Sequence, residues 1–331
     1  MPTYSIVVPA YNEEAVIPEL VRRLAKLLDA LDGEAEAILV DDGSRDGTYE
    51  RMVEETNADP RFRLVRLSRN FGHQIALTAG VDLAAGDAVI VMDADLQHPP
   101  EVVLKLAERW REGYDVVFAV REERAGETRF KRMTAAWFYR GFNRISEVQV
   151  PVDVGDFRLV DRRVLDVFHE MRESNRFVRG MFSWIGLSQT GVSYTGEERF
   201  AGESKYPLRR MLRFAAAGVI SFSSAPLRLA LNLGFLVSIL SFAFGVWSIV
   251  VKFSGLYEVP GWTSLVVVTT LIGGVQLIVL GVIGEYIGSI HDEVKRRPLY
   301  VVGELEGFPQ LPPQPPRGII ADRRGRGDER G

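Results

Sequence analysis

The sequence predicts an α/β domain with a mostly parallel sheet, followed by two transmembrane helices. Two observations predict this architecture. Strand-like and helix-like runs alternate over roughly the first 120 residues, and two long apolar stretches without a charged residue lie in the last third of the chain. Such alternation is typical of a sheet covered by helices. Each apolar stretch is long enough to cross a hydrocarbon core about 30 Å thick.

Short apolar runs of four to six residues predict the strands, at 5–8, 37–40, 62–67, 88–92 and 116–120. Apolar residues at a helical period predict helices between them, at 14–31, 49–57, 74–85 and 101–111. Ligands of such sheets bind beyond the carboxyl ends of the strands, so we expect the chemistry there. Residues 121–205 are less regular and carry no predicted helix or strand.

Two aspartates, Asp93 and Asp95, follow the fourth predicted strand. Their carboxylates leave the strand for a loop, where both can reach one cation. Mg²⁺ usually takes one or two carboxylates together with phosphate oxygens, so such a pair can hold a nucleoside diphosphate as a leaving group. A solvated acidic turn is the alternative interpretation, because short D-x-D motifs are common.

The composition narrows the class of protein. The 331 residues are 47% hydrophobic and 25% charged, which suits a sizeable core and argues against wholesale disorder. A net charge of -4 gives no general attraction to nucleic acid, and we expect no such partner. Because the chain has no cysteine, disulfides and thiol nucleophiles are excluded. The N-terminus enters a strand-like run at once, so we expect no secretory signal.

The two apolar stretches span residues 229–251 and 265–284. Because they occur in tandem with a short loop between them, they favour membrane helices over buried helices of a soluble domain. Basic residues flank the pair on its outer sides, at Arg209, Arg210, Arg213, Arg228, Lys295, Arg296 and Arg297. By the positive-inside rule we expect a multi-pass protein of the inner (plasma) membrane, with the catalytic domain and both termini in the cytoplasm.

These patterns divide the chain into four parts. We expect a cytoplasmic catalytic domain over residues 1–205 and amphipathic membrane-surface helices over 206–226. Two transmembrane helices follow over 227–290. The last part, 291–331, is expected to be a cytoplasmic tail that is disordered from about residue 309, where proline, arginine and glycine dominate.

Six motifs identify a family that the chain resembles. They are, in chain order, VVPAYNEE, VDDGSRDGT, RLSRNFG, MDADLQHPPE, VGDFRL and GESKY. Together they resemble the family 2 glycosyltransferases with the GT-A fold, in which a Rossmann-like sheet binds a nucleotide sugar. With the paired apolar stretches, the chain resembles the polyprenyl-phosphate branch, which includes dolichol-phosphate mannosyltransferases and bactoprenol glucosyltransferases. The resemblance covers about residues 4–300, and six motifs in register are far more specific than one.

The resemblance implies a role for each motif position. Residues that would bind the nucleotide sugar are Pro9, Tyr11, Glu13, Val40, Asp42, Asp93, Ala94, Gln97 and Arg121. Asp95 would be the principal ligand of Mg²⁺ or Mn²⁺, with Gln97 nearby, and Asp156 would lie at the sugar and acceptor. Residues that would hold the lipid phosphate are Arg121, Arg199 and Lys205.

A lipid phosphate is already an anionic nucleophile near neutral pH, so the reaction needs no strong general base. Asp156 is therefore assigned to orientation, or to stabilising an oxocarbenium-like sugar, rather than to proton abstraction. An anionic acceptor that approaches an anionic donor also needs cations. Those available are Arg121, Arg129, Lys131, Arg132, Arg199 and Lys205.

None of the four histidines is among the residues predicted to bind the nucleotide sugar, the cation or the lipid phosphate. His98 could be a metal ligand, but beside two prolines it is expected to be a loop residue. His73, His169 and His291 have no partner at a suggestive spacing and are expected to be structural or exposed.

The resemblance implies an inverting, metal-dependent membrane enzyme. UDP- and GDP-sugars both remain open as donors, and UDP-glucose with undecaprenyl phosphate is the best single guess. One alternative is a processive polysaccharide synthase, which would need more spans and usually a Q-x-x-R-W motif. Another is a non-catalytic partner that binds a nucleotide sugar and supports a flippase or a downstream glycosyltransferase. Gly284 and Gly288, near the end of the second span, form a close-packing motif that would join either the two spans or neighbouring protomers. With the family resemblance, the glycine-rich span makes a homo-oligomer an expected state.

Overall fold

The computed structural model describes residues 3–121, 154–195, 223, 225–254, 261–309, 315 and 318–320. Strands and helices alternate up to residue 121, as β1 (Tyr4–Ala10), α1 (Ile17–Ala30), β2 (Ala35–Asp41), α2 (Thr48–Thr56), β3 (Phe62–Leu67), α3 (His73–Leu83), β4 (Ala88–Val91), α4 (Val102–Arg111) and β5 (Val116–Arg121). Every element that the sequence predicts in this region is present, with ends that differ by a few residues. The predicted α/β alternation is therefore confirmed.

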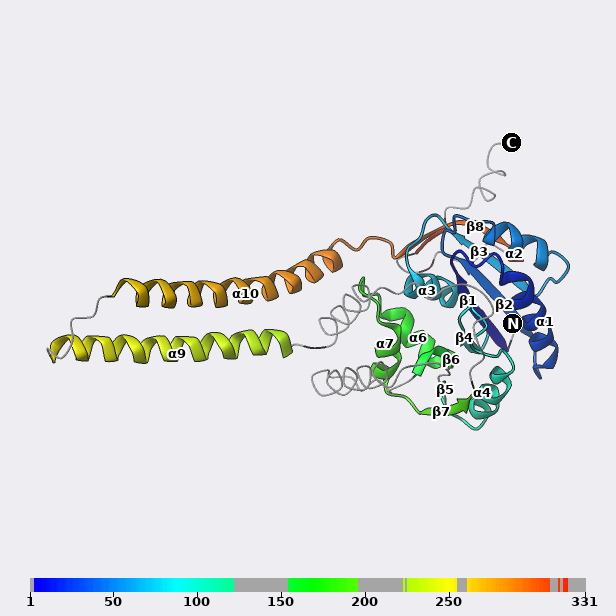
Figure 1. Cartoon of the computed structure of the whole chain (residues 1–331). Coiled ribbons are helices and arrows are strands. Elements are labelled where there is room, and N and C mark those ends of the chain that lie inside the picture. The colour runs from blue at the N-terminus through cyan, green and yellow to red at the C-terminus, as the bar shows by residue number, and fades with distance from the viewer. Residues whose placement is uncertain are drawn as a thin grey trace.

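A second set of elements lies beyond residue 153. It contains β6 (Val154–Asp161), α6 (Arg162–Glu170), α7 (Val178–Ile185), β7 (Gln189–Tyr194), α9 (Ala225–Phe253), α10 (Trp262–Val294), β8 (Tyr300–Glu306) and β9 (Gly318–Ile320). The strands form one sheet with the order β7-β5-β6-β4-β1-β2-β3-β8-β9 (Figure 1). Strands β4, β1, β2 and β3 run parallel, whereas β6 is antiparallel to both of its neighbours. The sheet is thus parallel at its centre and mixed toward its edges.

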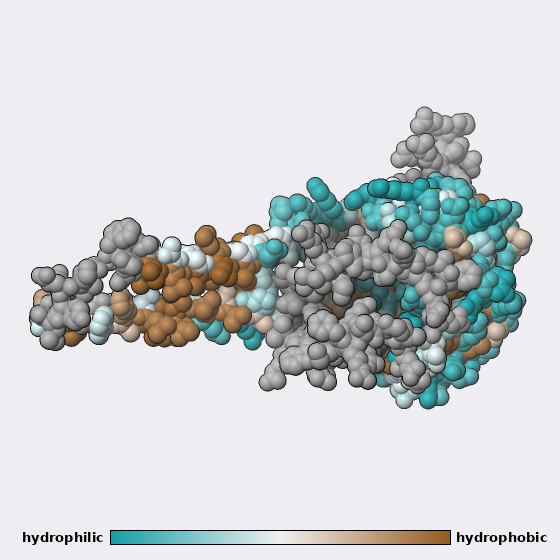
Figure 2. Space-filling view, in the orientation of Figure 1, coloured by the Kyte–Doolittle hydropathy of each residue, from teal (hydrophilic) through white to brown (hydrophobic). Residues whose placement is uncertain are grey.

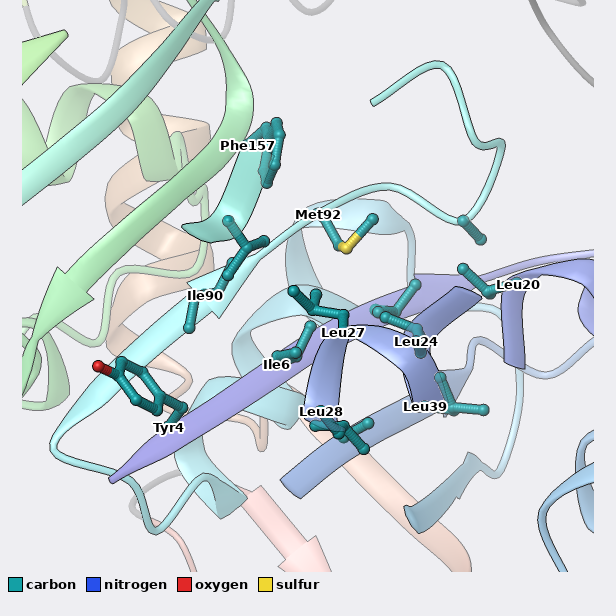
Figure 3. Close-up of a cluster of buried hydrophobic side chains, with 14 of the residues drawn as sticks. Tyr4, Ile6, Leu20, Leu24, Leu27, Leu28, Leu39, Ile90, Met92 and Phe157 are labelled. Atoms are coloured by element: carbon teal, nitrogen blue, oxygen red, sulfur yellow. The ribbon is translucent and has the colours of Figure 1, made fainter. Parts of the chain in front are cut away.

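Each face of the sheet carries its own hydrophobic core. Because successive side chains of a strand point to opposite faces, Ile6 packs with α1, α2 and α4, and Val7 packs with α3, α6 and α7. Figure 3 shows the first of these cores, in which Leu24 and Met92 lie near Ile6. Full burial of such a side chain stabilises the fold by about 1.5–3 kcal/mol.

Helix α3 lies unusually close to the centre of the sheet. A Cβ atom at Gly80 would stand 2.3 Å from Cγ1 of Val7 and 2.9 Å from Cγ2 of Val40, so only glycine fits between helix and sheet. This close packing fixes the first residue of the helix, His73, beside the ends of the central strands.

Strand β8 returns the chain to the sheet after the second apolar helix. It pairs antiparallel with β3, and its residues Tyr300, Val302 and Leu305 are buried. Strand β9 then pairs with β8. The prediction of disorder from about residue 309 is therefore wrong for residues 318–320. The tail was judged on its proline, arginine and glycine content, which does not reveal how alternating apolar residues can extend a sheet edge.

Helices α9 and α10 present their apolar side chains to the outside. The parts Ala225–Trp247 and Val267–Val294 are long and apolar enough to cross a membrane. Leu231 and Phe242 expose 73% and 75% of their surface, so these are not core helices of a soluble domain. The helices lie side by side and extend away from the sheet as an apolar rod (Figures 1 and 2). Exposed apolar surface of this extent suggests association with a membrane.

Of the predicted amphipathic segment 206–226, residues 206–222 and 224 lie outside the described residues. Ala225 and Pro226 belong to α9.

Candidate active site

The pairing of β4 with β6 brings two distant aspartates to one edge of the sheet. Val91 pairs with Arg158 in antiparallel register, and the same register continued by two residues sets Asp93 opposite Asp156. The carboxyl ends of the parallel strands β1 and β2 lie at this edge as well. The loops after β1, β2 and β4 therefore meet at the start of β6, where the sequence predicts the chemistry.

An imidazole lies between these two aspartates. His73 Nε2 is 3.3 Å from Asp93 Oδ1 and 3.5 Å from Asp156 Oδ2. Burial alone would lower the pKa of His73, but its hydrogen bond to Asp156 and the charges of both carboxylates raise the pKa to about 9. At neutral pH the ring is a cation between two anions.

Asp156 is buried and held by several donors. Arg179 donates from Nε to Oδ1 at 2.7 Å and from Nη2 to Oδ2 at 3.3 Å. Gln74 donates from Nε2 to Oδ2 at 3.0 Å. Burial opposes ionisation, but the charge of Arg179 and the bonds from His73 and Arg179 hold the pKa of Asp156 well below its ordinary value. An ionised carboxylate so fully engaged is a weak base, which suits orientation rather than proton abstraction.

Asp93 is also held by a second histidine. His98 Nε2 is 3.3 Å from Asp93 Oδ2, and His98 Nδ1 shares a hydrogen bond with the hydroxyl of Tyr194 at the end of β7. The His98 ring packs against Phe157 of β6. Burial would raise the pKa of Asp93, but the hydrogen bond from His98 and the charge of His73 keep it lowered.

The next turn contains the predicted cation ligands. Leu96 has φ 58°, a left-handed conformation that is uncommon for a bulky residue, and its side chain is buried. The buried side chain anchors this turn and leaves Asp95 and Gln97 partly exposed on either side of it. The backbone N–H of Gln97 donates to Asp95 Oδ1 at 3.1 Å, and Arg121 Nη1 donates to Gln97 Oε1 at 3.4 Å. Backbone strain of this kind is concentrated at functional sites.

These residues fit a cation that binds together with a diphosphate. Across the part of the chain that the structure describes, no three acidic or histidine side chains gather as a ready metal site. A diphosphate-bound Mg²⁺ needs only one or two carboxylates, since phosphate oxygens and water complete its shell. The partly exposed carboxylate of Asp95 is suited to that role.

Asp42 organises the loop that leads into α3. Its Oδ1 accepts from the amide of Phe71 at 2.7 Å, and its Oδ2 accepts from the amide of Gly72 and from Asn70 Nδ2, both at 2.9 Å. Burial raises the pKa of Asp42 to about 6, although the two amide bonds act to lower it. The predicted role of Asp42 at the ribose stays a prediction.

The remaining predicted donor residues lie around the ends of β1 and β2. Pro9 pairs with Val40, so these two are neighbours in the sheet. Tyr11 exposes 38% of its surface just beyond β1. The amide of Glu13 donates to Thr48 Oγ1 at 2.9 Å, which fixes the loop after β1 to the start of α2. Ala94 is buried between the two aspartates of its motif.

The structure thus brings the predicted residues of the first 121 positions and Asp156 to one edge of the sheet. Some predicted cations lie outside the described residues, namely Arg129, Lys131, Arg132, Arg199 and Lys205.

Sequence reasoning missed four residues of this site, which are His73, His98, Gln74 and Arg179. The expectation that His73 is only structural or exposed is corrected, because its ring contacts both central carboxylates. His98 is a loop residue as expected, but it also holds Asp93. His73 is 20 residues from Asp93 and 83 from Asp156, so no local spacing could have revealed the contact.

Comparison with known proteins places this site in a family. The model of glycosyl transferase family 2 matches residues 5–168. An uncharacterized glycosyltransferase of Bacillus subtilis, YkcC, is 49% identical over 92% of this chain and 94% of its own. A bactoprenol glucosyl transferase of Shigella flexneri, derived from prophage SfII, is 41% identical over 90% of this chain and 96% of its own. The prophage bactoprenol glucosyl transferase homolog of Escherichia coli is 39% identical over 91% and 99%.

Solved structures resemble the chain less closely. Mannosyl-3-phosphoglycerate synthase from Rubrobacter xylanophilus shares 18% identity at a TM-score of 0.48, over 66% of this chain and 72% of its own. The family model and the sequence relatives therefore carry the assignment. The chain belongs to glycosyl transferase family 2 and is a glycosyltransferase enzyme of GT-A fold.

Proposed function

We propose that this enzyme transfers glucose from UDP-glucose to a polyprenyl phosphate, with a divalent cation, at the cytoplasmic face of the membrane. One observation carries the proposal: relatives named bactoprenol glucosyl transferases match 298 residues of this chain at about 40% identity. That match is longer than the 5–168 catalytic region, so the likeness extends toward the apolar helices. An enzyme whose acceptor is a membrane lipid has a physical reason to carry such helices.

The donor would bind across the ends of β1, β2 and β4. Pro9 and Val40, which are paired and buried, would underlie the base as an apolar floor, and Tyr11 offers an exposed ring against which a base can stack. Glu13 and Asp42 lie beside this floor as acceptors for ribose hydroxyls. Asp93 and Ala94 approach the nucleotide from the β4 loop.

The diphosphate requires charge compensation. Asp95, with Gln97 alongside, would hold a Mg²⁺ or Mn²⁺ ion, which when bound would supply that positive charge. Arg121, which donates to Gln97, adds a fixed positive charge at the same place.

The acceptor phosphate would attack the sugar from the side opposite the nucleotide, with inversion. Asp156 and Arg179 would then orient the sugar and the acceptor, because the carboxylate is ionised and already fully engaged. Arg121, Arg199 and Lys205 would hold the lipid phosphate. Helices α9 and α10 would set the domain at the bilayer surface, with both termini in the cytoplasm. We also propose that the enzyme forms a homo-oligomer. Its lipid-linked product would be used by a flippase or by a downstream glycosyltransferase.

The test is transfer by the purified full chain in detergent. Undecaprenyl phosphate and Mg²⁺ are mixed in turn with labelled UDP-glucose, UDP-galactose and GDP-mannose, and labelled lipid is measured. We expect product from UDP-glucose, loss of product with EDTA, and a fall of about 10² in turnover for Asp95→Asn. Asp166→Asn is the control, because Asp166 is an exposed aspartate of α6.

Transfer from none of the donors would contradict the proposal. Transfer that survives both EDTA and Asp95→Asn would contradict its cation. Preference for another nucleotide sugar would overturn the donor and leave the acceptor standing.

A further inference from the structure

We propose that His73 is a positioning residue of this enzyme, which ties Asp93 of the β4 loop to Asp156 of β6 and so fixes the gap in which the sugar is transferred. The inference deepens the proposed function and rests on it for the identity of the transferred sugar. It concerns a contact between side chains and can be tested without a substrate.

Five consecutive residues, 70–74, contact three carboxylates of the site, those of Asp42, Asp93 and Asp156; we call them the bridging segment. Asn70, Phe71 and Gly72 donate to Asp42 at the end of β2. His73 contacts the aspartates at the ends of β4 and β6. One short segment therefore joins three strand ends.

The last residue of the bridging segment extends this bracing to α7. Gln74 donates to Asp156 from Nε2, and its Oε1 accepts from the amide of Val178 at 3.1 Å. Val178 is the first residue of α7, and Arg179, the other partner of Asp156, follows it. The bridging segment thus contacts Asp156 and also the start of the helix that carries Arg179.

Among the bridging segment's contacts that the structure describes, only those of His73 connect the loop after β4, through Asp93, to β6, through Asp156. His73 Nε2 lies 3.3 Å from Asp93 and 3.5 Å from Asp156, so without the imidazole the two side chains would lose the contact that they share. Without that contact, the bridging segment would no longer tie the loop after β4 to the start of β6. A shift of the donor by even about 1 Å can cost 10² in rate.

The packing of α3 on the sheet holds His73 in this position. The glycine at position 80 lets α3 pack tightly on β1 and β2, which fixes the helix start on which His73 stands. The ring still exposes 38% of its side chain and thus borders the open site. A histidine needed only for packing would not have to be at this border.

The first experiment asks whether the bridge exists. In protein labelled with ¹⁵N at its four histidines, the Nε2 resonance of His73, assigned by its loss in His73→Gln, is followed in Asp93→Asn and in Asp156→Asn. We expect each single variant to shift this resonance, while Asp166→Asn leaves it unchanged. A resonance that responds to only one of the two aspartates overturns the bridge.

The second experiment asks whether the bridge positions the reactants. His73→Ala should lower kcat about 10- to 100-fold at saturating substrates, with a change below about threefold in KM for the nucleotide sugar. His73→Gln, which keeps an N–H donor at similar reach, should recover most of that loss. His291→Gln, on the exposed end of α10, is the matched control and should behave as wild type.

Three outcomes would overturn the positioning role: an unchanged kcat in His73→Ala, a loss confined to KM, or no recovery in His73→Gln. If the wild type transfers no sugar from any donor, the proposed function fails, while the resonance experiment still decides the bridge. If His73→Ala does not fold, the resonance is still measured in the two aspartate variants. The kinetics are then compared between wild type, His73→Gln and the two aspartate variants.

Discussion

Asp42 and Asp156 are the same residue type, equally buried, at the same edge of one sheet, yet their carboxylates behave oppositely. They expose 2% and 5% of their surface. The partners of Asp42 are neutral, two backbone amides and an asparagine, and burial raises its pKa to about 6. The partners of Asp156 include Arg179 and the charged His73, and its pKa is lowered. The charge of the partners, more than burial, decides the state of a carboxylate.

The contrast extends to the two halves of the domain. In the donor half, β1 to β4, Asp42 at the end of β2 is held by neutral donors of the loop that leads into α3. The acceptor half contains buried cations: Arg158 donates to the carbonyl of Gly155 and lies over the ring of Phe182, and burial lowers its pKa to about 10. Because Asp156 is held by a charged partner, Arg179, we expect its removal to cost more stability than removal of Asp42, whose contacts are neutral.

The largest expected effect follows from removing the charge of Asp156. Asp156→Ala leaves Arg179 and His73 without their shared anion, and breaking a buried pair typically costs about 3–5 kcal/mol. The melting temperature in detergent should fall by at least about 6 °C, and transfer should be lost. Asp166→Ala, on the exposed side of α6, should stay within about 0.5 kcal/mol of wild type. Similar melting temperatures for Asp156→Ala and Asp166→Ala would show that the charged contacts of Asp156 do not stabilise the fold.

A second, smaller effect is expected in the response to pH, with opposite signs for the two aspartates. The pKa of Asp42 is about 6 against an ordinary 3.8, so its contribution to stability is full below pH 4 and is lost as the pH rises through 6. Relative to Asp42→Asn, the wild type should therefore gain about 2 kcal/mol of unfolding free energy between pH 7 and pH 4.

Asp156 should behave in the reverse way. Its lowered pKa gives a contribution that is present above the ordinary value and is lost as the pH falls below about 4. Melting temperatures of wild type, Asp42→Asn and Asp156→Asn from pH 7 down to about pH 3 give both differences. If the stability differences for Asp42→Asn and Asp156→Asn changed in the same direction with pH, the charge of the contacting residues would not determine the direction of the pKa shift.

The same contrast explains how far the sequence could lead. Asp42, Asp93 and Asp95 each follow a strand that is recognised from its apolar residues. The place of these aspartates at the end of a strand can therefore be predicted from the neighbouring sequence. Parallel pairing then placed these ends together. Arg179, His73 and Gln74 have no such signal, because they meet Asp156 only when β6 inserts antiparallel between β4 and β5. The run that forms β6 contains Asp156 and Arg158, two buried charges that break the expected apolar pattern.

Strand β8 was missed for a related reason. Its burial depends on β3 as a neighbour, and the two are more than 230 residues apart in the chain. Composition and local period carry no information about such pairing. The two apolar helices, in contrast, are predicted from their own residues alone, although α10 continues ten residues beyond the predicted apolar stretch.

The smallest expected effect tests the role of partner charge at a third buried carboxylate. Asp82 of α3 is held by a charged partner, Arg172, at 2.8 and 3.0 Å, and by a neutral one, the hydroxyl of Tyr300, at 2.8 Å. Tyr300→Phe removes only the neutral bond, and the arginine continues to pair the charge. We expect a loss of about 1 kcal/mol in unfolding free energy, measured by denaturant titration in detergent. Tyr114→Phe, a partly buried tyrosine before β5, is the control. A loss as large as that of Asp156→Ala would mean that neutral partners hold a buried carboxylate as firmly as charged ones do.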